Sequence, residues 1–144
     1  MAEEVLVGLR ELTRALRALV EEYSEEGRIF TLVMLIPAEP ASPAGNHTLV
    51  VSAPWLDKLS PREAVSAILK SLLQELGSTQ SPGYRTLARI MPISTTDPFV
   101  ATVTSAFPVL DGGVVTIQNQ EINGVLVERA VLLESRSPDQ VESR

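Results

Sequence analysis

The start of the chain carries an apolar stripe with helical spacing. Hydrophobic residues recur at intervals of four and three, at Val5, Leu9, Leu12, Leu16, Leu19 and Tyr23, which is the pattern of one face of an amphipathic helix. Gly27 is suited to end this helix, because glycine adopts a positive φ without strain. The stripe can pack on its own chain or pair with a second copy. Packing within the chain is favoured, because a coiled coil usually needs three or four heptads.

Two apolar runs after this helix predict a pair of strands. Residues 28–37 and 47–53 are rich in β-branched and other apolar residues, which is typical of buried strands. The segment 37–46 between them is rich in Pro, Ala, Gly and Ser, which is loop composition. We therefore expect the two strands to form a hairpin.

A second helix has the clearest start signal in the chain. In Ser60-Pro61-Arg62-Glu63 the serine hydroxyl and the glutamate carboxylate can each accept a hydrogen bond from the other residue's backbone, and proline takes the first helical position. Apolar residues follow at helical spacing until Gly77. Residues 78–83 then have loop composition, and residues 84–93 predict a third strand.

The segment 98–107 fits two kinds of structure. Phe99, Val103 and Phe107 have helical spacing, whereas alternate residues of the same segment fit a strand. The preceding Asp97-Pro98 favours a helix, because aspartate is a good N-cap and proline fits the first turn.

A β-hairpin is predicted near the C-terminus. Asn123-Gly124 lies between the runs 114–122 and 125–133, and both residues tolerate the positive φ of a type I′ turn. Such a turn places Val115 opposite Leu132 and Gln118 opposite Arg129. Because the pairs near the turn are polar, we expect the hairpin to project beyond the core as an arm.

These elements follow the order α-β-β-α-β-α-β-β and predict an α+β fold. We expect about five strands in one antiparallel or mixed sheet, with two or three helices packed on it. The 144 residues suit one domain, and no internal repeat divides them. Residues 1–134 are therefore expected to form a single globular domain, and the polar residues 135–144 a flexible tail.

Composition narrows the function classes. Acidic residues outnumber basic ones 18 to 12, for a net charge of −6, which disfavours nucleic acid as a partner. The absence of cysteine excludes thiol catalysis and thiolate metal sites. No glycine motif for phosphate or dinucleotide binding is present, so we expect no cofactor. Without a signal sequence or a long apolar span, we expect a cytoplasmic protein with no membrane partner.

Arg85 and Arg89 are the candidate ligand-binding residues. In a strand over 84–93 they share one face, and Arg89 lies within the apolar run 87–91. A guanidinium in apolar surroundings needs a carboxylate or another fixed acceptor. A salt bridge or an exposed sheet face is the simpler interpretation. The alternative is that the two arginines hold a phosphate or carboxylate ligand.

Other residues with chemical potential have simpler structural interpretations. His47 is the single histidine and no nucleophile elbow accompanies it, so a catalytic triad is disfavoured. Trp55 can be a lid on the core or an anchor residue of an interface, and the lid is the favoured interpretation. Solvated helix surface is the favoured interpretation of two further groups, with no metal site expected: Arg10, Arg14 and Arg17, and the acidic cluster Glu21, Glu22, Glu25 and Glu26. The alternative for the three arginines is a basic stripe that contacts an acidic partner or nucleic acid.

The sequence favours a small non-enzymatic domain that acts through contact with other proteins, most simply as a homodimer. Leu9, Leu12 and Leu16 of the first helix and Asn123-Gly124 of the hairpin turn are its candidate interface residues. The alternative is a regulator or enzyme that binds a small anion through Arg85 and Arg89. Whether the protein is an enzyme is left open.

Overall fold

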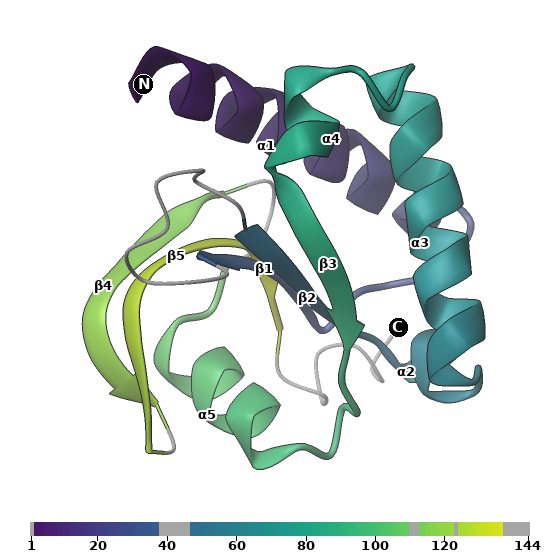
Figure 1. Ribbon diagram of the computed structural model, residues 1–144. Helices are drawn as coiled ribbons and strands as arrows, with labels where there is room; N and C mark the ends of the chain where they lie inside the picture. Colours follow the sequence, from purple (N-terminus) through teal and green to yellow (C-terminus); the bar gives the residue numbers. More distant parts are fainter. Residues whose placement is uncertain (1, 38–46, 110–112, 123, 137–144) are drawn as a thin grey trace.

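The computed structural model describes residues 2–37, 47–109, 113–122 and 124–136, and for residues 2–6, 119, 125, 126 and 128 it describes the backbone alone (Figure 1). The helices are α1 (Ala2–Glu25), α2 (Pro54–Asp57), α3 (Pro61–Leu76), α4 (Pro82–Thr86) and α5 (Pro98–Ala106). The strands are β1 (Leu32–Pro37), β2 (His47–Ser52), β3 (Leu87–Pro92), β4 (Val115–Ile122) and β5 (Val125–Ser135). The predicted α+β class and element order are confirmed, with two short helices, α2 and α4, in addition.

The strands form one five-stranded mixed sheet in the order β3-β2-β1-β5-β4. β1 pairs antiparallel with β2 and with β5, and β5 pairs antiparallel with β4. β2 and β3 are parallel, because α3 carries the chain back across the sheet between them. β3 and β4 are therefore the two edges of the sheet (Figure 1).

Each face of the sheet is buried under helices. Successive strand residues point to opposite faces, so Val33 and Leu35 of β1 join an apolar cluster with α1 and α3. Leu32 and Met34 join a second cluster, which includes Val100 and Val103 of α5. Helices α1 and α3 thus lie on one face and α5 on the other (Figure 1).

The apolar stripe of α1 packs within its own chain, as the sequence favours. Leu12 and Leu16 are fully enclosed in the first cluster, and Tyr23 lies at its rim. Trp55 of α2 stacks on Tyr23 with ring centroids 4.8 Å apart and meets Phe30 edge-on at 5.4 Å. The half-buried Trp55 therefore covers this cluster as a lid.

The capping box of α3 is confirmed. Ser60 N donates to Glu63 Oε1 at 3.0 Å, and Glu63 N donates to Ser60 Oγ at 3.2 Å. Hydrogen bonds to the Glu63 carboxylate from the backbone N–H of Ser60, and secondarily from the Ser60 side chain, hold the pKa of Glu63 below its ordinary value. Their contribution to stability is therefore present above the ordinary carboxyl pKa and is lost as the pH falls through the lowered value. Gly77 ends the helix with φ of 85°.

The strand predicted from residue 84 begins later. Residues 82–86 form α4, so this part of the prediction is wrong. Ser81 Oγ accepts a hydrogen bond from Tyr84 N at 3.3 Å, and Glu11 Oε1 of α1 accepts one from Gly83 N at 2.7 Å. Serine followed by proline is the same start signal that opens α3, and here it prevails over the strand pattern.

The C-terminal hairpin has the predicted register but a different shape. Val115 pairs with Leu132 and Gln118 with Arg129. Ile122, beside the turn, is only 2% exposed and belongs with Ile117 to the second cluster. The two residues are five apart and would face opposite sides of a flat ribbon, so the ribbon coils over the core, as strongly twisted two-stranded ribbons do. The predicted projecting arm is therefore wrong.

The segment 98–107 is helical, as Asp97-Pro98 favours. Asp97 Oδ1 accepts a hydrogen bond from Phe99 N at 2.8 Å and caps α5. Val100 and Val103 are its buried apolar residues. The cap and the burial of these valines under the sheet together settle the choice between helix and strand.

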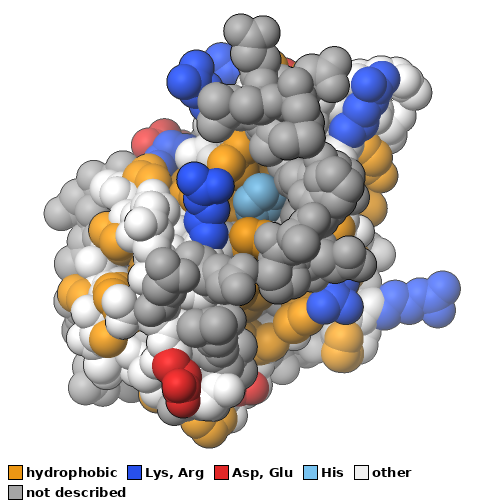
Figure 2. Space-filling model, turned by 60° about the vertical axis from the view of Figure 1, so that its left-hand side comes forward, with side chains coloured by type: hydrophobic (Ala, Val, Ile, Leu, Met, Phe, Trp, Pro, Cys, Tyr) orange, Lys and Arg blue, Asp and Glu red, His pale blue; other side chains and the backbone are white. Residues whose placement is uncertain are grey.

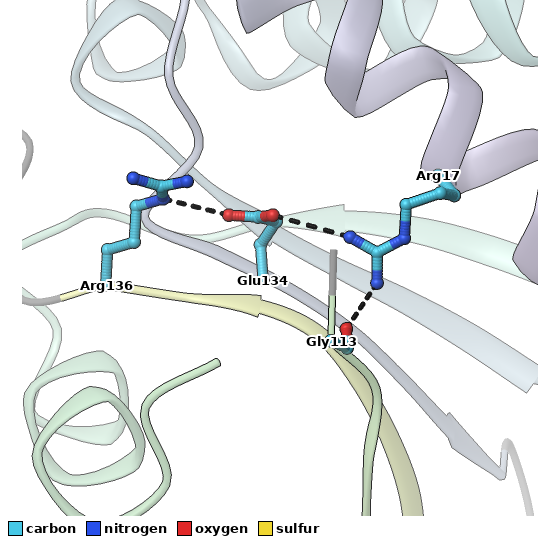
Figure 3. Close-up of polar contacts among 4 residues, drawn as sticks. All are labelled: Arg17, Gly113, Glu134 and Arg136. Carbon is cyan, nitrogen blue, oxygen red and sulfur yellow. Dashed lines mark hydrogen bonds and ion pairs between the residues drawn. The ribbon is translucent and has the colours of Figure 1, made fainter. Parts of the chain in front are cut away.

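A buried ionic cluster joins the end of β5 to α1 (Figure 3). Glu134 is 4% exposed; its Oε2 accepts from Arg136 Nε at 2.9 Å, and its Oε1 lies 3.5 Å from Arg17 Nη1. Arg17 Nη2 also donates to Gly113 O. β5 extends to Ser135, and Arg136 N donates to Thr31 O, so the first two residues of the predicted tail belong to the fold. The rest of that tail lies outside the described residues.

Candidate ligand-binding site

A recess opens where the start of α5 meets the sheet near its β3 edge. Its volume is about 310 Å³. Neighbouring strands build its floor in two cross-strand rows, Ile36–Thr48–Arg89 and then Val50–Met91. The other lining residues are Pro37, Ile93, Asp97 and Phe99. The recess is thus mainly apolar, with one cationic and one anionic side chain, which is the usual make-up of a small-ligand site.

Arg89 is the cationic group of this recess. Its Nε donates to Thr48 Oγ1 at 3.4 Å, and Thr48 is itself only 5% exposed. Within the described part of the chain, this hydrogen bond holds the Arg89 guanidinium against β2. The Arg89 residue as a whole is exposed. A ligand from solution can therefore reach the Arg89 side chain, and an arginine can bind a carboxylate or phosphate in two-pronged geometry.

A second, shallower recess lies on the other side of the β3 edge. It measures about 450 Å³ and lies between β3 and the first half of α3. Arg89 and Met91 line it together with Arg62, Val65 and Ser66. The described residues around it include no acidic side chain. Two arginines, Arg62 and Arg89, therefore line one recess at the β3 edge, and Arg62 is a site residue that the sequence pattern does not indicate.

The acidic group of the first recess is Asp97, at the start of α5. Its Oδ1 accepts a hydrogen bond from Phe99 N, so the carboxylate is engaged as the N-cap of α5. The recess therefore has one cationic side chain from β3 and one anionic side chain from the start of α5.

The predicted pairing of Arg85 with Arg89 is wrong. Arg85 is in α4, where Nη2 donates to Gln80 Oε1 at 3.4 Å, and it lines neither recess. Arg85 and Arg89 share one face only if residues 84–86 are part of the strand. Once those residues are helical, the two side chains no longer follow one strand pattern.

The candidate interface residues are placed in different surroundings. Leu12 and Leu16 are fully buried within the monomer, so they have no surface to offer to a second copy. Leu9 is half-buried against the first cluster. Gly124 is exposed, with φ of 79°, and Asn123 lies outside the described residues.

The other groups singled out in the sequence are divided between structure and solvent. Arg10 and Arg14 are exposed, whereas Arg17 belongs to the Glu134 cluster, so they do not form one uniform basic surface. His47 is 7% exposed in β2. In the described part of the chain, no group of three or more His, Cys, Asp or Glu side chains could hold a metal ion.

The acidic end of α1 meets a second acid from α3. A hydrogen bond with Glu75, partial desolvation and repulsion by the Glu75 carboxylate all raise the pKa of Glu22 above its ordinary value. The folded state therefore holds this proton more tightly than the unfolded chain does. The pair stabilises the fold below the ordinary carboxyl pKa, and this stabilisation is lost as the pH rises through the raised pKa.

Replacing Glu75 with glutamine should therefore stabilise the protein at neutral pH. Glutamine removes the repulsion but can still form a hydrogen bond with Glu22. The gain should be small, because both carboxylates are exposed and solvent screens them. It should shrink towards zero as the pH falls through the ordinary carboxyl range, and urea midpoints measured across pH would follow it. Glu21→Gln, the same charge change at an exposed site of α1, is the control; an equal pH-dependent gain there would rule out this pairing.

Comparison with protein-family models, curated proteins and solved structures gives no match for this chain. Within the described residues, no helix is both long and apolar enough to cross a membrane.

Proposed function

We propose that this protein binds a small amphipathic anion, such as an apolar carboxylate, in the Arg89 recess. The observation that carries the proposal is an arginine anchored on a buried threonine at the rim of an apolar recess of about 310 Å³. The anionic group of the ligand would meet Arg89, and its apolar part would lie over Val50, Met91 and Phe99. Arg62, from the neighbouring recess, adds positive charge near the same end.

The geometry of the sheet supports binding of this kind. The recess is built mostly on strands β1, β2 and β3, and rigid elements hold binding groups more precisely than loops do. Its volume is at the lower end of the range for small-molecule sites. Asp97 at the start of α5 disfavours a second anionic group beside it, so the expected ligand has a single charged end.

Octanoate and its neutral analogue octanamide test the proposal by titration calorimetry. We expect octanoate to bind more tightly than octanamide, and shorter carboxylates to lose about fourfold in affinity per methylene removed. Arg89→Gln should weaken octanoate binding about tenfold, or about 1.4 kcal/mol. Arg85→Gln, an exposed arginine outside both recesses, should leave binding unchanged.

Two outcomes would contradict this function. One is that octanoate and octanamide bind equally, since the guanidinium would then contribute nothing. The other is that the Arg85 and Arg89 variants behave alike, which would indicate only a general effect of net charge. Thermal unfolding of both variants without ligand checks that the fold is retained.

A further inference from the structure

The β3 edge of the sheet has backbone hydrogen-bonding groups that β2 does not use. Ile93 N donates to Val51 O, so Ile93 and, two positions earlier, Met91 direct their backbone groups towards β2. Ile90 and Pro92 direct theirs the other way, and among the described residues β3 pairs with β2 alone. Proline has no N–H. The free edge therefore presents the N–H and C=O of Ile90 and the C=O of Pro92.

The β3 strand is also incompletely covered. None of its six residues is buried, whereas all six residues of β2 are. Ile90 is half-buried against the first cluster, and Met91 is half-buried on the other face, in the Arg89 recess. Pro92 and the register shift before Arg89 limit pairing at this edge to a short segment. A short added strand would cover apolar surface on both faces.

The second recess, of about 450 Å³, lies alongside this free edge and is basic. Arg62 and Arg89 line it, and its described lining includes no acidic side chain. Arg62 is exposed in the first turn of α3, and the start of α3 lies near the end of β3 (Figure 1). The turn from Figure 1 to Figure 2 takes this edge to the right-hand side, where basic and hydrophobic side chains lie next to one another. Charge complementarity therefore favours an acidic occupant.

We propose that the second recess binds an extended acidic segment of another protein, as a short strand antiparallel to β3. The segment residue opposite Ile90 exchanges two backbone hydrogen bonds with it and directs its side chain to the α3 face. The next residue of the segment lies opposite Arg89. Two positions before the first, a residue lies opposite Pro92 on the α3 face, where Arg62 lines the recess. A segment with the pattern acidic-apolar-apolar-acidic therefore meets both arginines and covers Ile90 and Met91.

Fluorescence anisotropy with the fluorescein-labelled peptide Gly-Glu-Val-Val-Glu-Gly tests the proposal. The same peptide with lysine at both glutamate positions should bind about tenfold more weakly or worse. N-methylation of the second valine, the residue opposite Ile90, removes the N–H that donates to Ile90 O and should weaken binding about tenfold. N-methylation of the first valine, whose N–H is directed away from β3, is the matched control and should have a smaller effect.

Charge reversal at Arg62 tests the protein side of the interaction. Arg62→Glu replaces attraction with repulsion and should weaken binding of the glutamate peptide about tenfold. The fold should tolerate the change, because the helix dipole favours an acid in the first turn. Lys70→Glu, the same charge change at an exposed position of α3 outside the recess, should bind like wild type. Neither the peptide pair nor this variant pair depends on octanoate binding at the Arg89 recess.

Several results would overturn this assignment. They are equal binding of the glutamate and lysine peptides, equal effects of the two N-methyl groups, equal binding by the Arg62 and Lys70 variants, and no binding by wild type at millimolar peptide. Light scattering tests a second copy as the occupant. If the chain self-associates and Arg62→Glu abolishes the association, the recess is an interface between copies and the proposal is wrong.

Discussion

Replacing Glu134 with alanine is expected to destabilise the protein by about 3 kcal/mol, the scale for removing one partner of a buried ion pair. Glu134 is 4% exposed and lies between Arg17 and Arg136. Their side chains are 19% and 15% exposed, so without the carboxylate two largely buried cations lose their counter-charge. The contact between α1 and β5 would weaken at the same point. Urea unfolding at neutral pH measures the loss.

A paired set of variants separates charge from packing at this cluster. Glu134→Gln keeps the shape of the side chain and should lose most of the same stability if charge is the cause. Arg136→Met removes one of the two cations and leaves the carboxylate paired with Arg17, so its cost should be smaller. A Glu134→Gln variant as stable as wild type would show that the ion pairs contribute nothing.

Replacing Gly8 with alanine should also be strongly destabilising, by about 2 kcal/mol. A Cβ at Gly8 would lie 2.1 Å from Thr86 Oγ1 and 2.8 Å from the backbone oxygen of Pro82. These atoms belong to the short helix α4, which packs directly on α1 at this point. In an open helical position the same change would stabilise by about 1 kcal/mol, so the sign of the effect reports the close contact.

The double variant Gly8→Ala with Thr86→Ala tests the cause of that loss. Removing the Thr86 hydroxyl eliminates the nearest clash, while the contact with the Pro82 oxygen remains. The double variant should therefore recover part of the stability in thermal unfolding. If Gly8→Ala alone raised the melting temperature, α1 and α4 would not be in close contact.

The sequence was most informative where one short segment contains the whole signal. The capping box at Ser60, the Asp97 cap and the Asn123-Gly124 turn are local motifs, and α3, α5 and the hairpin register follow from them. The physical reason is that a cap or a tight turn is satisfied by residues a few positions away. The same kind of signal at Ser81-Pro82 explains α4, where it prevails over the strand pattern that follows it.

The candidate site could be predicted only in part. Arg89 was found because a charged residue interrupts an apolar strand, and that local contrast is visible in the sequence. The neighbours of Arg89 could not be found in this way, because Ile36, Thr48 and Phe99 reach the recess from three other elements. Arg62 lies 27 positions before Arg89 in the printed sequence, and only the crossover of α3 places both at the β3 edge.

By itself, the sequence determined the types of the main elements, their order and the ends of several helices, because hydrophobic period and capping are local properties. Only the tertiary structure decided which surfaces are covered. The leucine stripe of α1 became core, and the hairpin coiled over the second cluster. The β1–β5 register shifts between Val33 and Met34, which places Glu134 opposite Val33, on the face covered by α1. The long-range pairing of strands fixes that shift, and with it the meeting of Glu134 and Arg17, residues from opposite ends of the chain.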